Sequence, residues 1–159
     1  MTSKNRLLSV LLATMIAGGA GTAMAAAGHS HDGHAATTVE LTLKNGKKWP
    51  TDEALRHGMG EIRSAVAATL KPIHKNTLDP AGYQALAARI EGQVDVIVKD
   101  CRLPDAADAQ LHLVLARILE GVEAMKAGPG RRDGAVGVVQ ALDAYGKHFD
   151  HTGWKPLAH

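Results

Sequence analysis

Hydrophobic residues recur with the period of an α-helix in four stretches of the chain. Each stretch places apolar side chains every three or four residues, as a helix with one buried face does. The four predicted helices span 51–71, 80–101, 106–127 and 133–150. The links between them are short, so we expect neighbouring helices to run antiparallel. The pattern predicts an all-α protein, an antiparallel up-down-up-down four-helix bundle.

Residues that start and stop helices support these boundaries. Thr51 can cap the first helix, and Asp79-Pro80 supplies a cap followed by proline at the first helical position. Pro72 ends or kinks the first helix, and Gly128-Pro129-Gly130 ends the third. Glycines inside the predicted helices each cost roughly 1 kcal/mol relative to alanine. They include Gly58, Gly60, Gly92, Gly121, Gly137 and Gly146. We expect that helices approach closely at these glycines, or that they leave room for a bound group.

The first 27 residues have the pattern of a secretory signal peptide. Lys4 and Arg6 precede a short apolar run, and Ala23-Met24-Ala25 provides small residues for cleavage. The apolar run is shorter than the roughly 20 residues that a membrane helix needs. We therefore expect export to the periplasm and no stable membrane insertion after cleavage. Residues 28–48 are predicted to form a flexible histidine-rich tail with a short extended segment, and residues 49–159 the bundle.

Charge and composition restrict the partners further. The chain has 18 Lys and Arg against 16 Asp and Glu, and loss of Lys4 and Arg6 with the signal peptide leaves 16 of each. This balance argues against nucleic acid as a partner, because nucleic acids select basic surfaces. The sequence indicates no particular protein partner. All nine histidines follow the predicted signal peptide, which makes metal binding the first chemistry to consider.

The predicted topology gathers possible metal ligands at one end of the bundle. This end combines the start of the first helix, the end of the second, the start of the third and the end of the fourth. Six ligand-type residues lie there: His57, Met59, Cys101, His112, His148 and His151. Imidazole, thiolate and thioether groups suit copper, with zinc as an alternative. His112 and His148 are the foremost candidates, because they are expected to face each other across adjacent helices.

Two alternative interpretations of the same residues remain open. Met59 and Cys101 lie on apolar stripes, where such side chains commonly pack in a core. Met59 and His148 also resemble, in bundle plan and position, the axial ligands of b562-type cytochromes, which are exported four-helix bundles. That resemblance implies non-covalent haem b, and the chain has no Cys-x-x-Cys-His motif for covalent attachment.

Three segments carry a resemblance at the level of a family. Residues 43–49, 103–112 and 144–154 resemble stretches of small exported proteins labelled DnrO. The resemblance covers most of the chain after the signal peptide. It implies an exported helical protein and no particular activity.

Catalytic motifs are absent from the sequence. The chain contains no Gly-x-Ser-x-Gly, no phosphate-binding glycine loop and no His-Glu-x-x-His, so we expect no enzyme. The leading prediction is a periplasmic metal-binding protein that sequesters or transfers copper. The alternatives are a cofactor-free structural or interaction module and a b-type haem protein.

Overall fold

The computed structural model describes residues 40–158, which belong to one compact unit that starts at Thr37. The predicted signal peptide and residues 28–39 of the predicted tail lie outside the described residues. The described part is all-α and contains four helices and no β-strand. They are α1 (Glu53–His74), α2 (Pro80–Asp100), α3 (Asp105–Ala127) and α4 (Arg131–His148). The predicted four-helix bundle is confirmed, with helix ends within a few residues of those expected.

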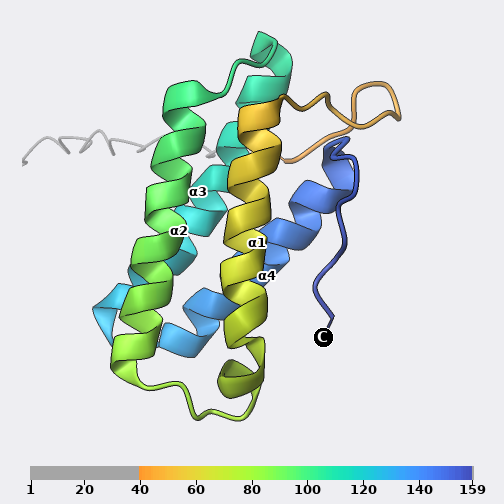
Figure 1. Cartoon of the computed structure of the whole chain (residues 1–159). Helices are drawn as coiled ribbons and strands as arrows, with labels where there is room; N and C mark the ends of the chain where they lie inside the picture. Colours follow the sequence, from red (N-terminus) through yellow and green to blue (C-terminus); the bar gives the residue numbers. More distant parts are fainter. Residues whose placement is uncertain (1–39, 159) are drawn as a thin grey trace, which may run out of the picture. The chain divides into compact units, whose positions relative to one another are not determined.

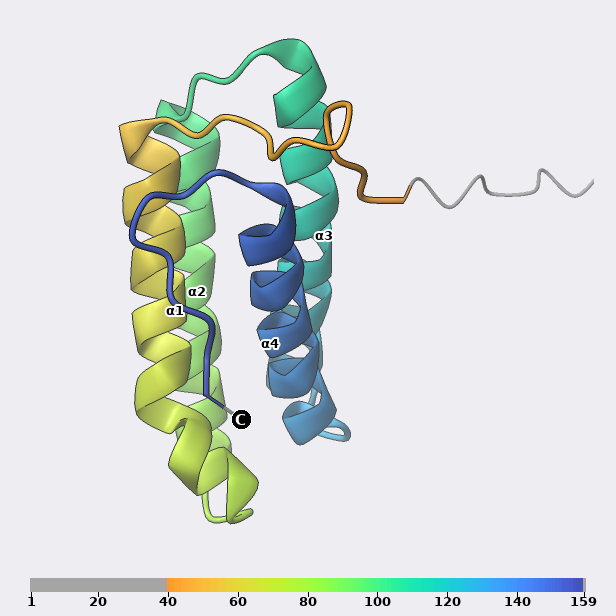
Figure 2. The ribbon, with the colours of Figure 1, turned by 90° about the vertical axis from the view of Figure 1, so that its right-hand side faces the viewer.

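The helices form two pairs that pack face to face. Figure 2 shows α1 beside α2 and, across the core, α3 beside α4. Each helix contacts its neighbours in chain order, and α4 closes the ring against α1. Successive helices alternate in direction in Figure 1. The bundle therefore has the alternating arrangement that short links favour.

Hydrogen bonds tie four segments together at one end of the bundle, which we call the closed pole. The carboxylate of Asp52, just before α1, accepts a hydrogen bond from the Arg102 amide after α2, at 2.5 Å. The Trp49 amide donates to the His148 carbonyl at the end of α4, at 2.8 Å. Near the start of α3, the side-chain oxygen of Gln110 accepts from the Thr42 amide. The four segments predicted to share one end of the bundle do meet there.

Local capping explains where the helices begin and end. Asp52, and not Thr51, caps α1, because its carboxylate accepts the Leu55 amide at 2.8 Å. Thr51 instead donates its hydroxyl to the Asp150 carbonyl. Asp79 caps α2 as predicted, with Gly82 as the donor. The first helix continues past Pro72 to His74, since a proline one turn from the end removes only one intrahelical hydrogen bond.

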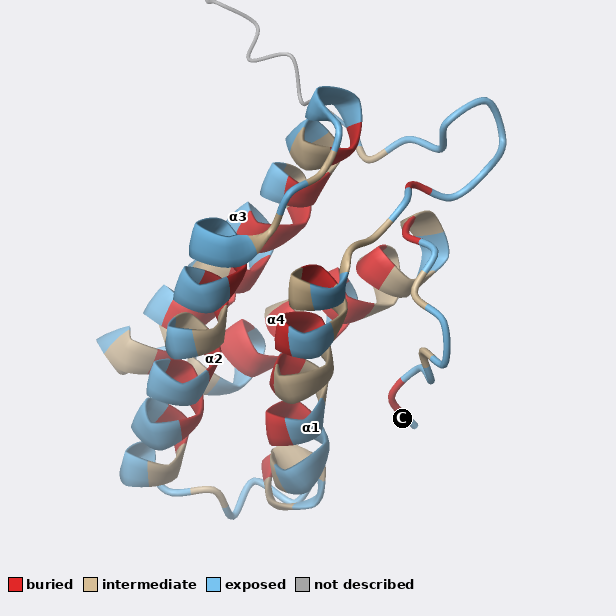
Figure 3. Ribbon diagram, turned by 45° about the horizontal axis from the view of Figure 1, so that its top comes forward, coloured by how far each residue is buried: buried red, intermediate tan, exposed pale blue. Residues whose placement is uncertain are grey.

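The core is built from aliphatic side chains of all four helices. Buried residues line the inward faces in Figure 3, and among the described residues no charged or strongly polar one is buried. Tyr145 and Phe149 are fully buried and stack with their ring centroids 5.1 Å apart. These two aromatic rings fill the core at the closed pole.

Two glycines allow α3 and α4 to approach until their backbones touch. A methyl group added to Gly121 would lie 2.5 Å from the Gly134 carbonyl oxygen, and one added to Gly134 would lie 2.6 Å from the Gly121 carbonyl oxygen. Contacts this short are well inside van der Waals distance. By contrast, Gly60, Gly92 and Gly137 have open space around the same position. The expected close approach thus occurs at some of the helical glycines and not at others.

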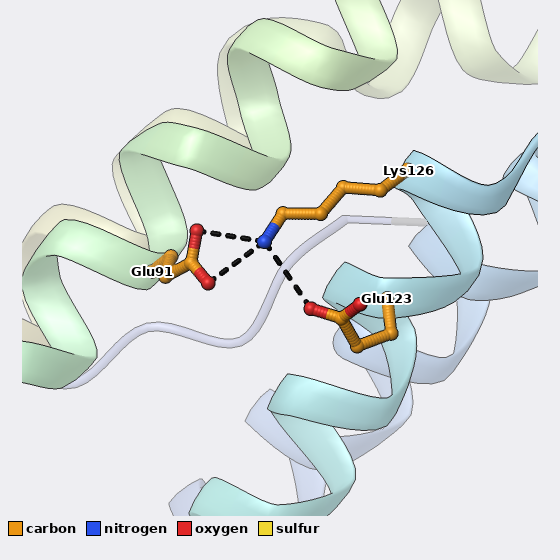
Figure 4. Close-up of polar contacts among 3 residues, drawn as sticks. All are labelled: Glu91, Glu123 and Lys126. Atoms are coloured by element: carbon orange, nitrogen blue, oxygen red, sulfur yellow. Dashed lines mark hydrogen bonds and ion pairs between the residues drawn. The ribbon is translucent and has the colours of Figure 1, made fainter.

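A polar contact joins the other side of α3 to α2. The Lys126 ammonium donates to both carboxylate oxygens of Glu91, at 2.7 and 2.8 Å, and to Glu123 at 3.2 Å (Figure 4). The hydrogen bond with Glu91, followed by that with Glu123, raises the pKa of Lys126. The contact lies on the surface, where an ion pair fixes orientation more than it adds stability.

We expect Gly121→Ala to destabilise the bundle and Gly92→Ala to stabilise it. The added methyl at residue 121 overpacks the α3–α4 contact, which costs roughly 1–3 kcal/mol. At exposed Gly92 the same change removes unfolded-state entropy and contributes up to about 1 kcal/mol. Urea unfolding followed by circular dichroism measures both. Equal effects of the two substitutions would contradict the close approach.

Candidate functional site

The six predicted metal ligands occupy different environments at the closed pole. Met59 is fully buried in the core, whereas His57 is exposed on α1. Cys101 is partly buried directly after α2. His148 and His151 are partly buried near the end of α4. The six side chains thus lie partly in the core, partly on the surface and partly in the loops of the closed pole.

The structure does not bring His112 and His148 together. His112 precedes Gly121 by nine residues, about two and a half helical turns, so the two lie on opposite faces of α3. Gly121 faces α4, and His112 therefore points away from it. The Nδ1 atom of His112 is 2.9 Å from the Asp108 carbonyl oxygen and 3.3 Å from its carboxylate. The Nδ1 atom of His148 is 2.7 Å from the Ala144 carbonyl oxygen.

Cys101 is held by the capping carboxylate of α1. Its thiol donates a hydrogen bond to Asp52, which also accepts the amides of Leu55 and Arg102. Burial first, and the charge of Asp52 second, raise the pKa of Cys101 to about 12. The pKa of Asp52 moves the other way. Partial burial raises it, but the three hydrogen bonds and the charge of Arg56 together lower it. Cys101 is thus a protonated structural thiol, joined to a carboxylate that stays ionised.

The remaining groups of the pole form an aromatic cluster at the end of α4. The Tyr145 hydroxyl lies 3.0 Å from Nδ1 of His151, and both rings pack edge-on or tilted against Trp154. Burial raises the pKa of Tyr145 and lowers that of His151, with the Arg56 charge as a further cause of the second shift. Tyr145 stays protonated and His151 favours its neutral form. These contacts hold the segment after α4 against the core.

Within residues 40–158, no group of three or more His, Cys, Asp or Glu side chains is arranged to hold a metal ion. The two residues predicted as haem ligands, Met59 and His148, also differ in their exposure to solvent. Met59 has no exposed surface, whereas His148 is partly exposed. Neither residue lines any of four cavities in this part of the chain.

A partly open, mainly apolar hollow lies away from the pole, between α1 and α4. We call it the α1–α4 groove, a cavity of about 350 Å³ between the end of α1 and the first half of α4. Its apolar floor is formed by Leu70, Ile73, Ala135, Val136 and Val139. Its rim is formed by His74, Arg132, Gln140 and Asp143. The volume is at the lower end of the range for small-molecule sites, roughly 300–1,000 Å³.

The C-terminal segment, residues 153–158, lies along the same gap. Figure 2 shows it passing between α1 and α4 as it leaves the pole. Trp154 covers Gly146, where a larger side chain would collide with the indole. The Arg63 guanidinium donates to the carbonyls of Lys155 and Pro156, and Leu157 is only 5 % exposed. Leu157 also lines the two further cavities that continue the groove.

Comparison with family models, with curated proteins and with solved structures finds no match to this chain. The resemblance to DnrO-labelled proteins and to b562-type cytochromes therefore stays a prediction. In the described part of the chain, no helix combines the length and the apolar character that crossing a membrane requires.

The groove was not predicted from the sequence, although two apolar residues outside the helical pattern, Val136 and Leu157, pointed to additional packing. Val136 lies on α4 outside the apolar stripe used to define that helix, and it is 42 % exposed. Leu157 follows a proline near the end of the chain, where no helix is predicted, yet it is buried. An apolar residue outside the periodic pattern was the available clue. The sequence patterns also did not predict that Asp52, Arg56 and Tyr145 lie together and organise the closed pole.

We expect Cys101 to react slowly with iodoacetamide at pH 8. A pKa near 12 leaves little thiolate, so alkylation of the folded protein should be at least about tenfold slower than of the urea-unfolded chain. Asp52→Asn removes the neighbouring negative charge and should speed the reaction, whereas Asp105→Asn on the surface should not. Mass spectrometry at timed intervals measures the rate. Fast alkylation of the folded wild type would contradict the structural role of this thiol.

Proposed function

We propose that this protein is an exported, cofactor-free binding module that holds a small apolar molecule in the α1–α4 groove. The observation that carries the proposal is the groove itself. Buried Ile73 and Val139 form its floor beside Val136, which is 42 % exposed. A concave site lined mainly by apolar side chains, with a few polar groups at its rim, is the usual form of a small-molecule site.

The chemistry of the closed pole supports binding over catalysis. Cys101 has a raised pKa, Tyr145 is fully buried, and His151 has a lowered pKa. Their partners are Asp52 and one another, so these groups hold the helix ends in place. We propose that the protein acts in the periplasm, as the amino-terminal pattern of residues 1–27 predicts.

We expect wild-type protein to bind the neutral, polarity-sensitive dye Nile red, with a rise in fluorescence. Val136→Trp fills the groove from an exposed position and should lower the affinity at least about tenfold, equivalent to about 1.4 kcal/mol. The matched control is Val98→Trp, because Val98 is 64 % exposed on α2 and does not line the groove. Circular dichroism checks that both variants stay folded. Equal binding by the two variants would refute the site.

A second proposal, copper or zinc binding, rests on one feature of two histidines. The Nδ1 atoms of His112 and His148 each lie within hydrogen-bond distance of a carbonyl of their own helix. This contact fixes the ring and leaves Nε2 for a ligand, as in many metal-binding histidines. Because the two rings do not face each other, we propose separate sites of one imidazole each. The histidines of residues 28–34 are candidates for additional ligands.

Titration with copper(I) and zinc tests this second proposal. We expect the His112→Ala, His148→Ala double variant to bind less metal than wild type, and binding by wild type to weaken as the pH falls through the imidazole range. His74→Ala is the control, because His74 is exposed at the far end of α1 and is not among the predicted ligands. Identical isotherms for wild type and the double variant would refute metal binding by this pair.

A further inference from the structure

Positive charge gathers at one end of the α1–α4 groove. Lys71 and Lys75, at the end of α1, line the cavity that adjoins the groove, and Arg132, at the start of α4, lines the groove itself. The two cavities meet at Leu70 and His74. Within the described residues, neither of the lysines nor Arg132 forms an ion pair or a side-chain hydrogen bond. These cations are therefore available to a ligand.

The opposite end of the groove has a different character. Asp143 is the one acidic residue that lines these three cavities of the described chain, and it follows Arg132 by eleven residues along α4. At 1.5 Å per residue this separation is about 16 Å. Between the two lie Ala135, Val136 and Val139, which continue the apolar floor. Lys147 lines the cavity that adjoins this end, beside Asp143. Within the described residues, the groove thus has unpaired cations at the Arg132 end, a mixed pair of charges at the other end and apolar side chains between them.

A neutral ligand uses only the floor, whereas an anionic amphiphile uses the floor and the cations. Arginine presents a planar fork of donors that matches a carboxylate, so Arg132 is suited to bind such a head group. We propose that the ligand of the groove is a medium-chain fatty acid, with its carboxylate beside Arg132 and its hydrocarbon chain along the floor. This inference rests on the proposed function of the groove.

The side chain of Leu157 shows that the cavities adjoining the groove accept aliphatic groups. Leu157 reaches 5 % exposure although it belongs to a segment without helical structure. Leu157 lines the same cavity as Lys71 and Lys75. A fatty acid chain has the same surface chemistry as leucine and can extend further along the floor to Val136, which is 42 % exposed.

Displacement of Nile red by three ligands with the same ten-carbon chain tests the head group. The ligands are decanoate, decanol and decyltrimethylammonium, each below its micelle concentration. We expect decanoate to compete about tenfold more tightly than decanol, and the cation to compete least. Arg132→Gln should remove most of the advantage of decanoate and leave decanol unchanged. Arg117→Gln, an exposed change on α3, is the control.

The outcomes distinguish the fatty-acid assignment from the more general proposal that the groove binds an apolar molecule. Equal competition by decanoate and decanol would overturn the fatty-acid assignment and leave an apolar site in place. Binding of decanoate by Arg132→Gln as tightly as by wild type would overturn the same assignment. If none of the three ligands competes and Nile red itself does not bind, the groove is not a binding site, and both proposals fail.

Discussion

The contact between the backbones of α3 and α4 at Gly121 and Gly134 is the constraint on which the rest of the bundle depends. Two helices that approach this closely leave no room for side chains between them, so α4 is drawn toward α3. The opposite face of α4 cannot then pack equally closely against α1. The bundle is tight on one side and open on the other, and the open side contains the groove.

The C-terminal segment compensates for part of this opening. Trp154 packs where Gly146 leaves space, and Leu157 inserts between helices that would otherwise expose more apolar surface. Burial of one leucine side chain stabilises a protein by about 1.5–3 kcal/mol. None of its described residues lines the α1–α4 groove, where Val136 stays exposed at 42 %. The same packing mismatch thus explains both the buried tail and the open floor.

Periodicity and capping were sufficient to predict the helices, because each depends on residues near in sequence. Asp79 illustrates this, since its cap involves Gly82, three residues later. Thr51 illustrates the limit. Both Thr51 and Asp52 are good caps, and long-range partners decide between them: Arg102 and Cys101 bind the aspartate, while Asp150 binds the threonine.

The site residues were harder to predict because helix rotation matters as much as helix position. His112 and His148 lie near the same end of the bundle, as expected, but a half-turn of phase on α3 directs His112 away from α4. Rotation is determined by the close contact at Gly121, which the sequence shows only as a glycine within a helix. The groove depends on the same helix packing and on the position of Leu157. Hydrophobic periodicity reports only on residues near in sequence, so it does not predict the groove.

The pairing of the segments before α1 and after α4 has a consequence for how the chain folds. Thr51 donates to the carbonyl of Asp150, a residue 99 positions away, and Trp49 pairs with the segment beside it. Contacts of such long sequence separation form late, after the local helices, because closing a long loop costs entropy. A chain that is made from its amino terminus onward cannot close the pole until Asp150 is present. Until then the hydrogen bonds that join the segments before α1 and after α4 are missing.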